Sequence, residues 1–284
     1  MQHPEAAIAE ERPTSTFARV NGLQLHYLDW GVRHSSGGHA QKHRPRTVAT
    51  TILLCHGGSA HCHWWDEVAP QLAECGQVLA LDFRGHGRSQ WASQYGLSAH
   101  LDDLVTFVRD HLRRRVVLVG HSMGGEIAMR LAVKYPQLLD GLVIADASPA
   151  GLPLRTRLVW RWKRRKQSGL RPQFPTAEML IARFRLSPPG HNLTPAALAA
   201  LALKGAEQLP SGNWAFRLDP THTHAIDRLA PGQMSNSGYP AAGADPSRRA
   251  QPPGIGAASA PNAASNPGVK IKDNTIRLSS HFGR

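Results

Sequence analysis

One serine of this chain lies in a sequence context that favours nucleophilic chemistry. An apolar run, Val116–Val119, leads directly into the pentapeptide GHSMG (120–124), and a helical pattern begins immediately afterwards. A serine between two glycines, at a sharp turn from a strand into a helix, exposes its hydroxyl for attack on a carbonyl carbon. The sequence therefore predicts Ser122 as a nucleophile. The amide of Met123, at the helix N-terminus, then faces the negative charge that such an attack creates.

A loop further upstream offers a second hydrogen-bond donor for the same chemistry. The segment LLCHGGSAH (53–61) is an apolar strand that ends in a histidine and two glycines. The backbone N–H of Gly58 is the candidate partner of Met123 in an oxyanion hole, a pair of amides that binds the tetrahedral intermediate. The alternative is that these glycines serve only to reverse the chain.

Apolar runs and helical patterns alternate along the first half of the chain, and these elements must position both loops. Polar and apolar residues alternate over 17–31 around Asn21-Gly22, which predicts a β-hairpin. The alternation of buried strands and amphipathic helices implies a mostly parallel sheet flanked by helices, with ligands at the carboxyl ends of the strands. The predicted buried strands are 47–55, 77–83, 115–120 and 139–147, and the predicted helices are 63–75, 97–112 and 123–135.

Four segments together resemble the α/β-hydrolase superfamily, in its branch of ester, lactone and C–C hydrolases. They are CHGGSAHCHWWDEVAP (55–70), LALDFRGHGRS (79–89), VVLVGHSMGGEIAMRLA (116–132) and GLVIADASPAG (141–151). The resemblance runs from about residue 17 to about residue 228. It implies the α/β-hydrolase fold with a helical cap, Ser122 as nucleophile, and the amides of Gly58 and Met123 as oxyanion hole.

The resemblance also implies an activity and supporting residues. The expected enzyme is a serine hydrolase that cleaves a small ester or related carbonyl substrate through an acyl-enzyme, with no cofactor and no metal. Asp82, Arg84 and His86 occupy the turn after the fourth strand, where the family uses them mainly to hold loops. His121, next to the nucleophile, is expected in the wall of the site rather than as the base.

The base and its acid are harder to find in this chain. Asp146 ends the sixth strand, a position that some members of the family use for the acid, although a loop-capping role is the alternative. Asp245 is a second candidate for the acid. His281, after a short apolar stretch, is the candidate base, whereas His222 and His224 are expected to be solvated loop residues.

The family places its acid and its histidine after a seventh and an eighth strand, which the sequence beyond residue 230 does not show. We therefore expect a fold that lacks its last two strands and leaves the sixth strand as an exposed apolar edge. A catalytically impaired hydrolase with an altered C-terminal region is accordingly the alternative to the active enzyme. A serine nucleophile without its base loses several orders of magnitude in rate.

The composition divides the chain into three predicted regions. These are a hydrolase core over 15–150, a helical cap over 151–228, and a low-complexity tail over 229–284. The tail is rich in Pro, Gly, Ala and Ser and is expected to be disordered. The cap contains RTRLVWRWKRRKQ (155–167), a basic segment that we interpret as a cap helix. Its alternative, a surface for nucleic acid or anionic membrane, is less favoured.

The net charge, the cysteines and the lengths of the apolar stretches give weaker indications of function. The chain has 33 Lys and Arg against 20 Asp and Glu, a net charge of +13, spread over many segments. This spread favours an arginine-rich surface over a nucleic-acid-binding stripe. The three cysteines have no disulfide or zinc-ligand spacing. No apolar stretch has the length of a leader or a membrane span, so a cytoplasmic protein acting on a small molecule is expected, in an oligomeric state that the sequence does not indicate.

Overall fold

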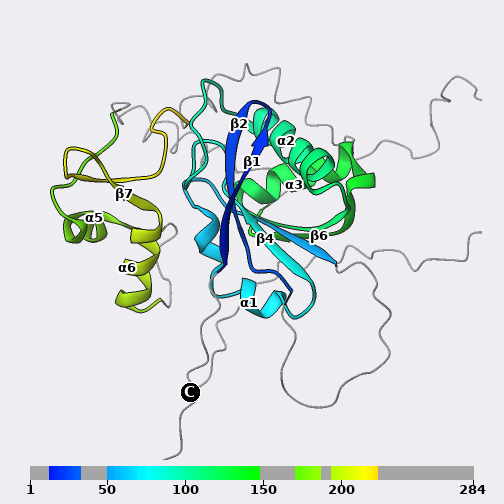
Figure 1. Cartoon of the computed structure of the whole chain (residues 1–284), viewed down its shortest axis with the longest axis horizontal. Coiled ribbons are helices and arrows are strands. Elements are labelled where there is room, and N and C mark those ends of the chain that lie inside the picture. The colour runs from blue at the N-terminus through cyan, green and yellow to red at the C-terminus, as the bar shows by residue number, and fades with distance from the viewer. Residues whose placement is uncertain (1–12, 33–49, 148–169, 187–192, 223–284) are drawn as a thin grey trace, which may run out of the picture.

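In the part of the chain that the structure describes, the main sheet has six strands in the order β1-β2-β4-β3-β5-β6. The computed structural model describes residues 13–32, 50–147, 170–186 and 193–222 (Figure 1). Within them, the four strands from β3 to β6 run parallel, and β2 joins the sheet antiparallel to β4. The strands are β1 (Thr14–Val20), β2 (Leu23–Asp29), β3 (Thr51–Cys55), β4 (Gln77–Leu81), β5 (Val116–His121) and β6 (Leu139–Ala145).

The first two strands form the predicted hairpin. Asn21 and Gly22 both have positive φ, at 48° and 80°, which is the backbone that a tight two-residue hairpin turn requires. The register pairs Val20 with Leu23 and continues to Thr14 opposite Asp29. The four predicted strands are confirmed, each within a few residues of its expected ends. Three of them are largely buried as expected, whereas in β6 only Leu139 is buried.

Helices cover both faces of the sheet. On one face α2 (Leu97–Thr106), its π-helical continuation η2 (Phe107–Leu112) and α3 (Met123–Lys134) bury their apolar sides in a large core cluster. On the other face, the 3₁₀ helix η1 (Cys62–Trp65) and α1 (Ala69–Leu72) close a smaller cluster. A short 3₁₀ turn, η3 (Pro136–Leu138), joins α3 to β6. Figure 1 shows α2 and α3 on one side of the strands and α1 at another edge.

The prediction of one continuous helix over 63–75 is wrong. The segment divides into η1 and α1, with α1 beginning one residue before Pro70. Proline has no backbone N–H and cannot bond to the carbonyl of Asp66, so a single helix through this position would lack a hydrogen bond. Proline is readily accommodated in the first turn of a new helix, which is where it lies.

A second group of elements follows residue 170, at the left of Figure 1. It contains α5 (Ala177–Arg183), α6 (Pro195–Lys204), β7 (Ala206–Gln208) and β8 (Trp214–Phe216), and β7 pairs antiparallel with β8. Thr176 and Thr194 cap the two helices by accepting hydrogen bonds from backbone amides of the first turn. The prediction of a purely helical cap missed this hairpin. The boundaries of the predicted core, cap and tail fall mostly outside the described residues and stay predictions.

Several contacts attach this second group to the core. Lys204 Nζ lies 2.5 Å from Asp66 Oδ2, and the amide of Asp219 donates to the carbonyl of Gly85 at 2.9 Å. The guanidinium of Arg171 stacks over Trp91, 5.2 Å from the ring centroid. The second group therefore rests on η1 and on the loop that follows β4.

Strand β6 is the outermost strand of the described sheet. Leu142 and Val143 in this strand are 38% and 40% exposed, although both belong to an apolar run. This agrees with the expectation of an exposed apolar edge. Within the described segments, no helix combines the length and apolar character that crossing a membrane requires.

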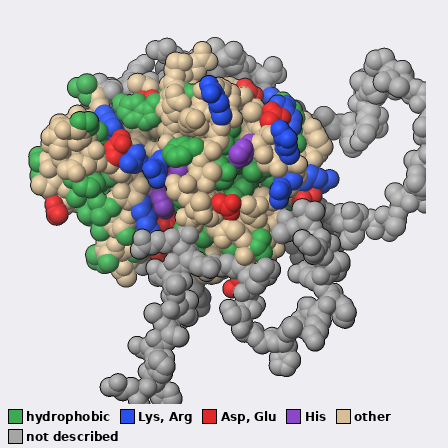
Figure 2. Space-filling model, viewed as in Figure 1, with side chains coloured by type: hydrophobic (Ala, Val, Ile, Leu, Met, Phe, Trp, Pro, Cys, Tyr) green, Lys and Arg blue, Asp and Glu red, His purple; other side chains and the backbone are tan. Residues whose placement is uncertain are grey.

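The charge of the described surface is dispersed on the face that Figure 2 shows. Lys and Arg side chains occur there in separate groups, with acidic, hydrophobic and other side chains between them. The predicted basic cap helix, 155–167, lies outside the described residues.

Candidate active site

Ser122 occupies a strained turn between β5 and α3. Its φ of 49° and ψ of −113° lie in a region that side-chain-bearing residues rarely adopt. The turn is held by two backbone hydrogen bonds: the Ser122 amide donates to the carbonyl of Ala145 at 2.9 Å, and the Ser122 carbonyl accepts from the amide of Glu126 at 3.0 Å. The residue is exposed. This geometry presents the serine at the carboxyl end of a central strand.

The two glycines of the pentapeptide are required by close backbone approach. A Cβ at Gly120 would lie 2.6 Å from the carbonyl oxygen of Gly124, and a Cβ at Gly124 would lie 2.5 Å from that of Cys55. Real Cβ atoms do not come this close to backbone oxygen atoms, so a side chain at Gly120 would force the start of α3 away from β5, and one at Gly124 would force it away from β3.

The loop after β3 lies against the elbow. A Cβ at Gly57 would be 3.3 Å from Ser122 Cβ, and one at Gly58 would be 3.9 Å from Met123 Sδ. The two residues predicted to donate to the oxyanion, Gly58 and Met123, are therefore neighbours: Gly58 lies on the loop after β3, and Met123 is the first residue of α3, directly after the serine. Their role as donors stays a prediction.

The imidazole of His56 braces this loop. Its Nδ1 lies 2.7 Å from the carbonyl oxygen of Gly57, and its Nε2 accepts from the amide of Phe83 at 3.1 Å. An N–H donor facing Nε2 and a carbonyl facing Nδ1 assign the proton to Nδ1. Burial lowers the pKa of His56, against the raising effect of Asp82, which keeps the ring neutral and the two bonds in place.

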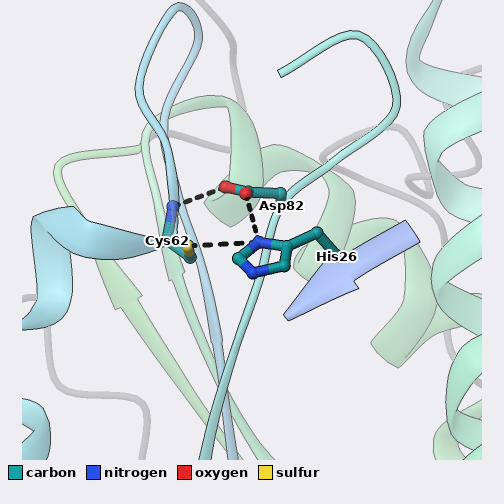
Figure 3. A group of neighbouring side chains, drawn as sticks. All are labelled: His26, Cys62 and Asp82. Carbon is teal, nitrogen blue, oxygen red and sulfur yellow. Dashed lines mark hydrogen bonds and ion pairs between the residues drawn. The ribbon is translucent and has the colours of Figure 1, made fainter. Parts of the chain in front are cut away.

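The carboxylate of Asp82 fastens three segments to the end of β4. Oδ1 accepts from the amide of Cys62 at 2.6 Å, and Oδ2 accepts from His26 Nδ1 at 2.7 Å (Figure 3). Oδ2 also accepts from the amide of Arg88 at 3.0 Å. Burial acts to raise the pKa of Asp82, but the hydrogen bond from His26, together with that from the amide of Arg88, prevails and lowers it to about 2.

The next residues of the same turn also hold loops. Arg84 binds both carboxylate oxygens of Asp103 at 2.6 Å, and His86 forms an isolated bridge with Leu218. These contacts agree with the loop-holding roles that the resemblance implies for Asp82, Arg84 and His86.

Asp146, the candidate acid, directly follows β6. It has a φ of 51°, its side chain is 80% exposed, and its Oδ2 lies 4.0 Å from Nε2 of His121. Burial lowers the pKa of His121, and the nearby charge of Asp146 acts in the opposite direction. The structure thus brings an acid and a histidine together beside Ser122, although at ion-pair distance rather than in a hydrogen bond.

The base is the component that the described part of the chain does not identify. None of the histidines described there forms a hydrogen bond with the Ser122 hydroxyl. The candidates His224, Asp245 and His281 lie outside the described residues.

His222 was expected to be a solvated loop residue, and that expectation is wrong. Its side chain is 4% exposed, and its ring centroid lies 4.8 Å from that of His86. The cause is the chain between Phe216 and His222, which crosses the loop after β4 and carries His222 into the interior.

Sequence reasoning missed the cluster to which His222 belongs. His86 has ring contacts with three other buried histidines, His56 at 5.1 Å, His100 at 6.1 Å and His222 at 4.8 Å. Burial is the main cause that lowers the pKa of His86 and of His100, the latter to about 3. These histidines come from four separate segments, so no local pattern indicated that they would meet.

Comparison with known proteins identifies the class. Residues 50–179 match the family model of the alpha/beta hydrolase fold. Esterase Rv0045c of Mycobacterium tuberculosis is 30% identical over 179 residues, which cover 62% of this chain and 58% of the esterase. Lipase LipV of the same organism is 36% identical over 112 residues, which cover 39% of this chain and 42% of the lipase.

A solved structure agrees in fold. An alpha/beta hydrolase from Novosphingobium aromaticivorans superposes with a TM-score of 0.60 at 21% identity, covering 78% of this chain and 74% of that one. The described residues therefore have the α/β-hydrolase fold, and the match to the family model lies within residues 50–179. Its sequence matches span about half the length of the curated relatives named above.

Proposed function

We propose that this chain is a serine hydrolase that cleaves a small ester or a related carbonyl substrate through an acyl-enzyme. The observation that carries the proposal is the exposed Ser122 on its strained elbow, directly beside the loop of Gly57 and Gly58. The names of the relatives, an esterase and a lipase, support an ester as the substrate class.

Each step has an assigned group. Ser122 Oγ attacks the carbonyl carbon and gives its proton to a base, while the amides of Gly58 and Met123 bind the resulting oxyanion. The base returns the proton to the departing alcohol, which leaves the acyl group on Ser122. Water, activated by the same base, then releases the acid and restores the serine.

Asp146 is the proposed acid, and His281 is the base that the sequence offers. His121 is the competing imidazole because it lies beside Asp146. Substituting each histidine by glutamine separates them. We expect His281→Gln to lower kcat for a p-nitrophenyl ester by at least about 10³-fold and His121→Gln to change it only slightly. The reverse pattern would transfer the role of base to His121.

Labelling by a fluorophosphonate probe tests the nucleophile itself. Such a probe reacts with activated serines, so we expect the wild-type protein to be labelled at Ser122 and Ser122→Ala to remain unlabelled. Ser211→Ala, in the turn between β7 and β8, is the matched control and should be labelled like wild type. Equal labelling of Ser122→Ala and wild type would refute the proposal.

A second candidate is a hydrolase fold that has lost most of its activity. Two observations on the described residues favour it: no imidazole is hydrogen-bonded to Ser122, and the sheet ends at β6. A serine hydrolase that lacks its base retains about 10³–10⁴-fold catalysis over water, from the oxyanion hole and substrate binding. Ester turnover at that level by folded wild-type protein, with no further loss in His121→Gln or His281→Gln, would establish this second candidate.

A further inference from the structure

Three side chains outside the proposed catalytic site converge in the interior of the core. His26 comes from β2, Cys62 from the start of η1 and Asp82 from the end of β4 (Figure 3). A nitrogen of His26, the sulfur of Cys62 and a carboxylate oxygen of Asp82 all lie within 4.8 Å of one another. Thiolate, imidazole and carboxylate are the groups that bind zinc and related transition metals. We propose that these three residues form a binding site for one divalent transition metal ion, with Zn²⁺ as its representative.

The charges of such a site balance. His26 and Cys62 are 0% exposed and Asp82 is 1% exposed, so an uncompensated charge here would be costly. A divalent ion with the Cys62 thiolate, the Asp82 carboxylate and a neutral imidazole has a net charge of zero. An ion of this charge therefore suits the cluster better than a monovalent cation or an anion does.

The distances between the donor atoms are close to those of a tetrahedral site. Zinc bonds of about 2.0–2.3 Å separate neighbouring ligand atoms by roughly 3.3–3.6 Å. Cys62 Sγ lies 3.7 Å from His26 Nδ1, and the carboxylate oxygen Oδ2 of Asp82 lies 2.7 Å from the same nitrogen. The first separation needs almost no change. The second, now a hydrogen bond, must open by roughly half an ångström, and a water molecule would fill the fourth position.

Neighbouring groups already orient the ligands as outer-shell partners do in metal sites. Ser15 Oγ lies 2.9 Å from His26 Nε2, and a hydroxyl oxygen there accepts the ring proton when Nδ1 is a ligand. The amide of Cys62 donates to Oδ1 of Asp82, and the amide of Arg88 donates to Oδ2. The carboxylate is thus fixed with one oxygen towards the imidazole and the thiol.

Metal binding forms three bonds, to Sγ, Nδ1 and Oδ2, which replace water ligands that the hydrated ion releases, and it breaks one S–H bond. The thiol proton goes to the buffer. The imidazole proton moves from Nδ1 to Nε2, where it is donated to Ser15 Oγ. One proton is released per metal ion, and no oxidant or reductant is needed.

An ion at this position would add coordination bonds between three segments that already meet through hydrogen bonds and apolar packing. It would tie β2 and the end of β4 to η1, which directly follows the loop of Gly57 and Gly58. Binding to the folded chain alone would raise its stability by mass action. The inference does not depend on the role of Ser122, because retained metal and thermal stability are measured without a substrate.

Cobalt(II) is the probe because a thiolate ligand gives it a sulfur-to-metal charge-transfer absorption. The full-length protein is incubated with excess Co²⁺ or Zn²⁺, passed through a gel-filtration column, and analysed for retained metal, for the charge-transfer band and for Tm. We expect about one ion per chain, the thiolate band, and a higher Tm for the loaded protein.

The decisive variant is Cys62→Ala, and its matched control is Cys75→Ala. Cys62→Ala removes only the sulfur and keeps the backbone amide that binds Asp82, whereas Cys75 is an exposed free cysteine. We expect Cys62→Ala to lose the band and to bind at least tenfold more weakly, and Cys75→Ala to behave like wild type. The proposal is overturned if wild type retains no metal, if Cys62→Ala keeps the band and its Tm response, or if Cys75→Ala loses them.

Discussion

Gly124 shows how little space the elbow leaves. A Cβ at this position would lie within 2.5 Å of one backbone oxygen and 2.7 Å of another, those of Cys55 and His56, and backbone at the end of a central strand cannot move aside. We expect Gly124→Ala to lower the free energy of unfolding by about 1–3 kcal/mol or more, as overpacking does. Urea denaturation measures the change.

Gly141→Ala is the matched control for this prediction. A Cβ at Gly141 would lie 3.6 Å from the methyl groups of Val117, which is ordinary van der Waals contact. This variant should keep nearly all of the wild-type stability. Similar losses in the two variants would show that the close approach at Gly124 is not what makes glycine necessary.

The individual residues whose roles could be predicted from sequence are those that are set by neighbouring residues in the chain. Ser122 was found because a strand, a turn and a helix are adjacent in the chain, and the turn residues Asn21 and Gly22 were found for the same reason. The metal-ligand cluster was not found, since Cys62 lies 36 residues from His26 and 20 from Asp82. Only the folded sheet brings these side chains together, and the burial of His222 has the same origin.

At the scale of elements, β6 is the outermost strand of the described sheet, so one of its edges has no neighbouring strand there. An apolar strand edge can pair with the edge of another molecule, and lysine at such an edge opposes this pairing. We expect wild-type protein to associate increasingly with concentration in light scattering, and Val143→Lys to reduce that association. Because Val143 is 40% exposed, the substitution should change stability by less than about 0.5 kcal/mol.

Val133→Lys separates an edge effect from a general gain in charge. Val133 is 49% exposed but lies on the helix α3 rather than on an edge strand. If it suppressed association as strongly as Val143→Lys, added charge rather than edge pairing would be the cause.

Element prediction succeeded where periodicity and packing agreed. The predicted strands and α3 match their predicted segments. In a layered sheet, a continuous apolar run indicates a strand, and apolar residues at a 3.6-residue spacing indicate a helix that packs on it. It failed at η1 and α1, where Pro70 interrupts an otherwise helical pattern. It failed again at β7 and β8, which are strands of three residues and too short for alternation to be recognised.

At the scale of the whole molecule, buried histidines make stability depend on pH. Burial lowers the pKa of His61 to about 4 and that of His100 to about 3, while unfolded histidine titrates near 6.5. Between 6.5 and those folded values the unfolded chain binds protons that the folded chain does not, so stability falls as the pH falls and is constant above that window. Each such histidine contributes up to about 1.4 kcal/mol per pH unit.

Denaturation by urea at about pH 7.5 and about pH 5 measures this slope. His100→Phe should make it shallower by about one histidine's contribution, because His100 is buried between Phe83 and Tyr95 and its Nδ1 has no hydrogen-bond partner in the described structure. Equal stability at the two pH values would contradict the prediction.

The strained backbone of Ser122 lowers the stability of the folded chain. A residue with a side chain at φ 49° and ψ −113° costs of order 1–3 kcal/mol, and glycine adopts this conformation without that cost. Ser122→Gly should therefore unfold at a higher Tm than Ser122→Ala, although both lack the hydroxyl, and calorimetry of the two variants compares them directly. This conformational cost lowers the stability of every folded molecule, whether or not substrate is present. Serine at position 122 supplies the hydroxyl, whereas glycine at the same position would give the more stable fold. One sequence cannot have both.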